Sequence, residues 1–115
     1  EVLVQSFTFC ASSHPITYLD ATPVFIDSEP DSWNMDPELL EKAIIDRKEK
    51  TGKYPKAIVP VALYGMPYDC DKIMAISEKY GIPVVEDAAE GCGSDERSGA
   101  VHSVSLACCH STAIR

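Results

Sequence analysis

The sequence has few basic residues, no long apolar run and none of the common phosphate-binding or hydrolase motifs. It holds 10 lysines and arginines against 18 aspartates and glutamates, a formal net charge of −8 over 115 residues. Proteins that bind nucleic-acid backbones concentrate positive charge on one face, so we expect no nucleic-acid partner. No stretch approaches the roughly 20 apolar residues that cross a bilayer, and no secretory leader opens the chain. We therefore expect a cytoplasmic protein without a membrane contact.

Cysteine is present but not in a pattern that binds metal. The five cysteines are odd in number and lack paired CxxC spacing. We interpret them as reduced thiols. The adjacent residues Cys108, Cys109 and His110 have no second cluster of ligands, so we predict no metal site.

What the chain does have is a regular alternation of apolar strands and amphipathic helices. Asp36-Pro37-Glu38 is typical of a helix start, and Gly52 and Gly81 are typical of helix ends. Ile16 and Leu19 are expected on the buried face of the first helix. Strands are predicted near residues 2–4, 22–27, 57–61 and 83–87, and helices near 11–19, 36–50 and 69–80.

This order predicts an α/β domain built on a mostly parallel sheet with flanking helices. Both the first and the last residues lack the usual start or stop signals, so we expect a piece of a larger domain. In such a domain, ligands bind beyond the carboxyl ends of the strands. The segments to examine are therefore 5–9, 63–67 and the residues from Asp87 onwards.

Several residues in these segments can carry chemistry. Asp87 ends an apolar strand, where a carboxylate either caps the next turn or contributes to a cofactor site. Glu90 follows three residues later, close enough to share a face on a helical turn, and two neighbouring acids need partners or one stays protonated. Phe7 and Phe9 follow the first strand, and we expect one of them to be a core residue and the other a stacking platform. Gly65 is expected to serve a turn.

Five ordered stretches of the chain resemble one known family. They are Ser6-Phe7-Thr8-Phe9, residues 21–27, Met35-Asp36-Pro37, residues 63–67 and residues 85–90. Together they resemble the DegT/DnrJ/StrS family of pyridoxal-phosphate-dependent sugar aminotransferases. The resemblance implies a partial large domain of the aspartate-aminotransferase type I fold. It also implies a homodimeric parent enzyme that transfers an amino group from an amino acid, expected to be glutamate, to a nucleotide-linked keto-sugar.

The resemblance also implies roles for three residues. Asp87 matches the acid that pairs with the pyridine nitrogen of pyridoxal 5'-phosphate and keeps it protonated. Glu90 matches the residue that approaches the ring hydroxyl, and Phe9 matches the aromatic residue that stacks on the ring. A small α/β ligand-binding or interaction domain without catalysis is the alternative.

The family pattern breaks in the last part of the chain. Residues 1–94 match a partial pyridoxal-phosphate-binding large domain, whereas residues 95–115 diverge and contain no lysine. The family has its Schiff-base lysine there, in a segment like SFNGNK that also supplies a phosphate-binding serine. One back-translation of residues 102–115 reads FGEFGVLSFNGNK in another frame, so we hypothesise a frameshift between about residues 94 and 102. Without that lysine we predict that this chain alone is inactive.

Some members of the family are dehydratases that have histidine in place of the lysine. His110 falls at the lysine position in neither reading frame, so the sequence does not favour a dehydratase.

Overall fold

Five parallel strands form the centre of the structure, a computed structural model that describes residues 1–90 and 103–105. The strand order is β2-β1-β3-β4-β5, and every neighbouring pair is parallel. This arrangement confirms the predicted parallel sheet. The fifth strand lies in the divergent tail, where the sequence predicted none. The strands are β1 (Val2–Gln5), β2 (Pro23–Ile26), β3 (Ile58–Val59), β4 (Val84–Glu86) and β5 (Ser103–Ser105).

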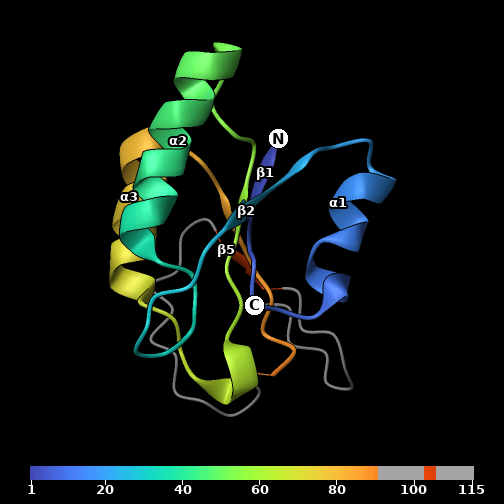
Figure 1. The fold of residues 1–115 in the computed structure, drawn as a ribbon, viewed down its shortest axis with the longest axis vertical. Coiled ribbons are helices and arrows are strands. Elements are labelled where there is room, and N and C mark those ends of the chain that lie inside the picture. The colour runs from blue at the N-terminus through green and yellow to red at the C-terminus, as the bar shows by residue number, and fades with distance from the viewer. Residues whose placement is uncertain (91–102, 106–115) are drawn as a thin grey trace.

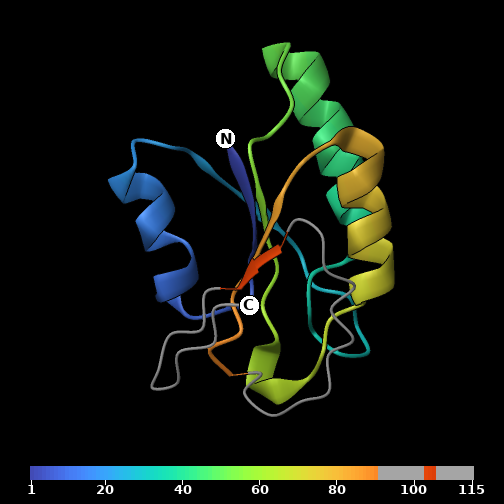
Figure 2. The ribbon, with the colours of Figure 1, turned by 180° about the vertical axis from the view of Figure 1, so that it is seen from behind.

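Helices cover both faces of this sheet. Figures 1 and 2 show α1 (His14–Tyr18) on one face, and α2 (Pro37–Thr51) and α3 (Cys70–Tyr80) on the other. Two short 3-10 helices, η1 (Cys10–Ser12) and η2 (Leu63–Gly65), follow β1 and β3. The predicted alternation of strands and helices is confirmed through β4. Among the described residues, no helix is long and apolar enough to span a membrane.

Local sequence signals explain where α2 begins and ends. The Asp36 carboxylate accepts hydrogen bonds from the backbone N–H groups of Glu38 and Leu39, at 2.7 and 3.3 Å, which satisfies donors left free in the first turn. At the other end, Gly52 takes the left-handed conformation that closes the helix (φ 74°). The Lys48 ammonium also donates to the Gly52 carbonyl at 3.0 Å. The start and stop predicted for this helix are therefore confirmed.

The two faces of the sheet bury very different amounts of apolar surface. On the face covered by α2 and α3, Leu40, Ile44 and Ile73 are fully buried. They belong to one core cluster with residues of β1 to β4, namely Leu3, Ile26, Ile58 and Val84. On the α1 face, the buried apolar cluster of the described part of the chain consists of Val4, Ile16 and Val59. We will call these the α2/α3 face and the α1 face.

The first helix differs from its prediction. The structure divides residues 11–19 into η1 and a five-residue α1, with Pro15 in the first turn of α1. Ile16 is buried as expected, but Leu19 is 81 % exposed, so its predicted burial is wrong. The reason is that α1 ends at Tyr18, and Leu19 has already left the helical stripe (φ −94°, ψ 17°).

The topology marks one place on the sheet for a ligand. From β1 the chain passes through α1 to β2, and from β3 it passes through α3 to β4 on the opposite side of the β1–β3 pair. The loops after β1 and β3 therefore turn toward opposite faces. In open parallel sheets, such a switch point leaves a crevice beyond the carboxyl ends of the strands.

Candidate functional site

Asp87 stands at the carboxyl end of β4, next to this switch point. Its backbone N–H donates to the Pro60 carbonyl at 3.0 Å, which continues the β3–β4 pairing past the last strand residue. Its carboxylate is half-buried and accepts hydrogen bonds from the Ser12 hydroxyl at 2.6 Å and the Ala89 backbone N–H at 3.2 Å. The carboxylate is thus held from two sides and keeps capacity to accept a further donor.

Ser12 reaches Asp87 across 75 residues of sequence because η1 carries it back over the sheet. The serine is 8 % exposed, and its hydroxyl lies 2.9 Å from the Thr8 hydroxyl. Sequence reasoning did not find Ser12 or Thr8 as site residues. The segment from residue 6 to residue 13 contains several serines and threonines, so only the tertiary fold shows which of their hydroxyl groups lie near Asp87.

Glu90 lies in the same region, but not as predicted. Residues 89 and 90 form a bend rather than a helical turn, so Glu90 does not share a helical face with Asp87. Instead the Glu90 carboxylate accepts a hydrogen bond from the Tyr64 backbone N–H at 2.5 Å. The two acids therefore have separate partners, Ser12 for one and Tyr64 for the other.

Gly65 lies in a turn, as predicted, and this turn contacts residue 90. Its φ is +79°, a conformation that favours glycine, and a Cβ added there would lie 3.3 Å from the Glu90 carbonyl oxygen. Tyr64 also has a positive φ of 52°. The turn thus brings two left-handed residues against the segment that follows Asp87.

Phe9 lies in the loop that leads from β1 to Ser12, and its side chain is 75 % exposed. Its exposed ring is available as a stacking platform. Phe7 is 46 % exposed and contacts the Trp33 ring, with centroids 5.7 Å apart. The prediction that one of the two phenylalanines belongs to the core is therefore wrong. The reason is that β1 ends at Gln5, so both phenylalanines lie outside the strand and its buried face.

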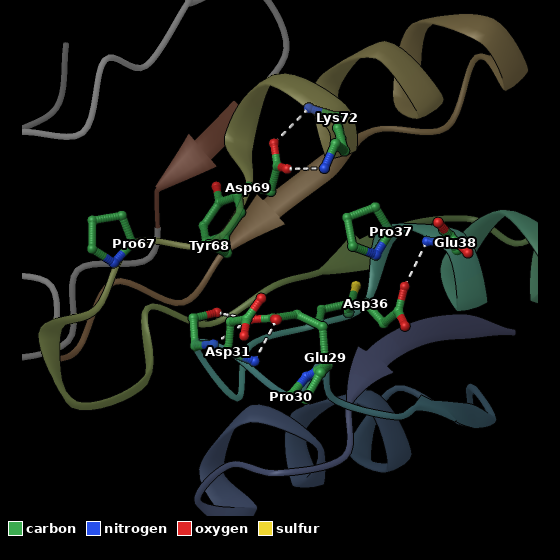
Figure 3. Close-up of a pocket in the computed structure, with 12 residues that line it drawn as sticks. Glu29, Pro30, Asp31, Asp36, Pro37, Glu38, Pro67, Tyr68, Asp69 and Lys72 are labelled. Atoms are coloured by element: carbon green, nitrogen blue, oxygen red, sulfur yellow. Dashed lines mark hydrogen bonds and ion pairs between the residues drawn. The ribbon is translucent and has the colours of Figure 1, made fainter.

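A second feature is an acidic pocket of about 570 Å³ beside the first turns of α2 and α3, drawn in Figure 3. The carboxylates of Glu29, Asp36 and Asp69 already have structural partners. Asp36 caps α2, and Asp69 caps α3 and pairs with the Lys72 ammonium at 2.7 Å. The Lys72 hydrogen bond lowers the pKa of Asp69. Bonds from the Ser32 side chain and from backbone N–H groups likewise lower the pKa of Glu29.

None of the residues predicted for the cofactor lines this pocket. Within residues 1–90 and 103–105, no group of three or more His, Cys, Asp or Glu side chains is placed to hold a metal ion. The rejected ligands Cys108, Cys109 and His110 lie outside the described residues, as does most of the divergent tail.

The described site fits one end of pyridoxal phosphate. A carboxylate fixed by Ser12, with spare acceptor capacity, suits a protonated ring nitrogen, and the exposed Phe9 ring suits a flat aromatic partner. The site does not supply an amine. All seven lysines of the chain precede β4, and none belongs to the segments that carry Phe9, Tyr64 or Asp87. The lysines are Lys42, Lys48, Lys50, Lys53, Lys56, Lys72 and Lys79.

A parallel sheet with helices on both faces and a carboxylate held at the carboxyl end of one strand defines a partial α/β domain with a candidate ligand site at that edge. The chain belongs to the DegT/DnrJ/EryC1/StrS aminotransferase family, which is pyridoxal-phosphate-dependent and which it matches over residues 1–112. The match therefore extends into the divergent tail.

Individual relatives agree with this assignment. The chain is 52 % identical over 93 residues to EpsN of Bacillus subtilis (strain 168), which is named for pyridoxal phosphate-dependent aminotransferase activity; the match covers 81 % of this chain and 24 % of that protein. It is 42 % identical over 111 residues to the UDP-2-acetamido-2-deoxy-3-oxo-D-glucuronate aminotransferase of Pseudomonas aeruginosa, covering 96 % and 29 %.

A solved structure shows the same fold. The crystal structure of a DegT DnrJ EryC1 StrS aminotransferase from Brucella abortus superposes with a TM-score of 0.74 at 44 % identity, covering 76 % of this chain and 24 % of that one. The predicted fold class and family are confirmed. The chain spans about a quarter of the length of the curated relatives that it matches.

Proposed function

We propose that this chain is the central part of the large domain of an aminotransferase that transfers an amino group from an amino acid, expected to be glutamate, to a nucleotide-linked keto-sugar. The observation that carries the proposal is the Asp87 carboxylate, held by Ser12 at the carboxyl edge of a family sheet. The relatives support the substrate class, because one of them is named for amino transfer to a UDP-linked keto-sugar acid. The parent enzyme is proposed to be a cytoplasmic homodimer.

Asp87 is proposed to hold a proton on the ring nitrogen of pyridoxal phosphate. When bound, pyridoxal phosphate supplies an electron sink for the carbanion that forms during amino transfer. An adjacent opposite charge changes a pKa by roughly 1 to 3, so the Asp87 carboxylate can keep that nitrogen protonated at neutral pH. Ser12 and the Ala89 N–H fix both carboxylate oxygens, so the acid is oriented before the ligand arrives.

Phe9 and Glu90 are proposed to orient the same ligand. The exposed Phe9 ring offers a face for stacking, and Glu90 offers an acceptor oxygen toward the ring hydroxyl. The Tyr64 N–H holds one oxygen of Glu90 and leaves the other free to bind. None of these residues supplies the base that moves the proton of the substrate.

That base is the missing lysine, so we propose that this chain by itself does not transfer amino groups. Residues 80–115 contain no lysine, and proton transfer by a positioned base contributes about 10² to 10⁴ in rate. We propose that a frame change between about residues 94 and 102 accounts for this absence, with residues 1–94 as the partial large domain and 95–115 out of frame. The family match itself continues to residue 112, so it does not mark this boundary.

A chimera tests the proposed function. Residues 1–94 replace the matching segment of the Pseudomonas aeruginosa relative, which supplies the lysine, and amino transfer to its named substrate is measured. We expect transfer by the chimera and none by the 115-residue chain. Asp87→Asn should abolish most of it, because the ring nitrogen loses its charged partner, whereas the exposed control Asp71→Asn should not. Equal activity of the Asp87→Asn and Asp71→Asn chimeras would contradict the proposed role of Asp87.

The same experiment addresses the alternative, a small α/β binding or interaction domain. The chimera that carries residues 1–94 is compared with a chimera that carries a scrambled version of this segment. If the first chimera is folded but binds pyridoxal phosphate no better than the second, the alternative is favoured. The readout is the change in absorbance of pyridoxal phosphate on binding, which does not depend on turnover.

A further inference from the structure

The only glutamine and the only asparagine of the chain are buried together beneath the carboxyl edge of the sheet. Gln5 is 0 % exposed and Asn34 is 1 % exposed. A side-chain amide that is buried without hydrogen bonds destabilises a protein, so residues of this type are retained inside only where they are bonded. Both amides are bonded here, and all of their partners are backbone groups of the loops around the candidate site.

Asn34 holds both ends of the η2 turn. Its Nδ2 donates to the Met66 carbonyl at 2.9 Å, and its Oδ1 accepts from the Leu63 N–H at 3.1 Å. These two bonds span the four residues 63–66. The amide therefore fixes the shape of this turn as a side-chain clamp would.

Gln5 holds Asn34 in place. Its Oε1 accepts from the Met35 N–H at 2.9 Å and from the Val61 N–H at 3.4 Å, and its Nε2 donates to the Phe7 carbonyl at 3.0 Å. One side chain at the end of β1 thus connects the loops that follow β1, β2 and β3. The two amides together fix three loops relative to one another.

The turn held by Asn34 needs an external restraint. Tyr64 has a φ of 52°, a left-handed conformation that costs a side-chain-bearing residue free energy. Its side chain is 82 % exposed, so packing of the ring does not compensate for that cost. The Tyr64 N–H nevertheless points at the Glu90 carboxylate, 2.5 Å away. The Asn34 bonds on either side of Tyr64 hold this conformation together with the backbone hydrogen bond from the Met66 N–H to the Leu63 carbonyl at 2.9 Å.

We propose that Asn34 is a positioning residue for Glu90, acting through the Tyr64 N–H of the η2 turn. Asn34 touches neither Glu90 nor the ligand. It keeps Tyr64 left-handed, and the Tyr64 N–H then fixes the carboxylate that is proposed to face the ring hydroxyl. The role of Glu90 toward the cofactor rests on the proposed function, whereas the Asn34–Tyr64–Glu90 coupling stands on the geometry of this chain alone.

Backbone NMR of the 115-residue chain tests the coupling. We define the Tyr64 response as the change in the Tyr64 amide resonance that Glu90→Gln causes by removing the carboxylate acceptor. We expect this response to disappear when Glu90→Gln is introduced into the Asn34→Ala or the Asn34→Ser chain, because each Asn34 variant removes the clamp. The Glu38 amide, which is bonded to the Asp36 carboxylate in the same manner, is the internal control, and its response to Asp36→Asn should remain in every variant.

Two outcomes decide the inference. Loss of the Tyr64 response with the Glu38 response retained supports it, since the chain is then folded and only the turn has changed. A wild-type Tyr64 response in both Asn34 variants overturns it. If a variant also loses the Glu38 response, the other variant provides the decision, and loss of both responses in both variants overturns the inference because Asn34 then serves the whole fold.

Failure of this inference is distinguishable from failure of the proposed function. If the Tyr64 response is unchanged in the Asn34 variants and the chimera is active, only the proposed role of Asn34 is refuted. If the chimera is inactive and the Tyr64 response is lost, the proposed function is refuted and the Asn34–Tyr64–Glu90 coupling is retained. In an active chimera, Asn34→Ser should weaken pyridoxal phosphate binding while Asp87 still responds to substitution, which a general loss of stability would not produce.

Discussion

The α2/α3 face and the α1 face of the same sheet differ in how many apolar residues they bury and in the polar groups they carry. The former buries ten residues in one apolar cluster, including Leu40, Ile44 and Ile58 at 0 % exposure. Among the residues that the structure describes, the latter buries three, and Phe25 and Leu19 are exposed at 56 % and 81 %. Burial of apolar surface is the main stabilising contribution to a fold, so the α2/α3 face stabilises this chain. The thinly covered α1 face carries the polar groups that hold Asp87.

This contrast separates substitutions that unfold the chain from those that change its site. On one face, a substitution should act through lost packing. On the other, it should act through hydrogen bonds and backbone conformation at the carboxyl edge, with a smaller effect on the free energy of unfolding.

Ile44→Ala should have the largest effect on stability. Ile44 lies on α2 and is fully buried in the core cluster, so the substitution removes buried methyl groups and leaves a cavity. We expect a loss of about 2–5 kcal/mol in the free energy of unfolding, measured by urea denaturation. The control Leu19→Ala, at the exposed end of α1, should change it by less than about 0.5 kcal/mol. Similar losses for both variants would contradict the difference between the faces.

Gly65→Ala should come next. The left-handed φ costs an alanine about 1–2 kcal/mol, and the added Cβ also lies 3.3 Å from the Glu90 carbonyl oxygen. Gly52→Ala is a matched control, because Gly52 has a similar φ of 74° but nothing within 4 Å of an added Cβ. We expect a larger loss of unfolding free energy for Gly65→Ala than for Gly52→Ala. Equal losses would mean that the contact with residue 90 is unimportant.

Ser12→Ala tests the hydrogen bond that holds Asp87. A hydrogen bond to a charged group contributes about 1.5 kcal/mol or more, and we expect the lower end because Asp87 is only half-buried. Ser13→Ala is the control, since the Ser13 hydroxyl donates only to the Cys10 carbonyl at an exposed position. Denaturation should separate the two variants. In the chimera, Ser12→Ala alone should also reduce amino transfer.

The pH dependence of stability should be the smallest effect and should come mainly from ion pairs around α2 and α3. The pKa of Glu41 is lowered by hydrogen bonds from Lys79 and Tyr80, and that of Asp69 by Lys72. A lowered folded-state pKa gives stability that is complete above the ordinary value of 4.5 for Glu41 or 3.8 for Asp69. That stability is lost as pH falls through the folded-state pKa.

Urea midpoints measured from neutral pH to below 3.8 should therefore decrease in acid. Lys79→Met should flatten part of this decrease, because the Glu41 carboxylate loses its cation. Lys53→Met, in the exposed loop after α2, should leave the curve unchanged. A Lys79→Met curve as steep as that of the unchanged chain would rule out this ion pair as a cause.

Local signals made most of the fold predictable from the sequence. Asp36-Pro37 and Gly52 are adjacent to the backbone groups that they satisfy or close, so the bounds of α2 follow from a few neighbouring residues. Asp87 is predicted as a cofactor residue because it ends an apolar strand and matches an acid of the family it resembles, and that role stays a prediction. Its place at the carboxyl edge then follows from the parallel topology.

The rest of the site depends on contacts between residues far apart in the chain. Ser12 meets Asp87 across 75 residues, and Asn34 meets Leu63 and Met66 across about 30. No local pattern encodes such pairs. The misjudged residues, Leu19 and Phe7, follow the ends of α1 and β1, where a periodic pattern no longer describes the direction of a side chain.

The most direct test of the account is the sequence of the coding DNA from codon 90 through codon 115 and beyond, read in all three frames. The account predicts that a frame other than the translated one continues the family after about residue 94, through a segment like SFNGNK with its lysine. If no frame contains that segment, the chain is not an aminotransferase domain interrupted by a frame change, and the explanation given for its missing lysine is wrong.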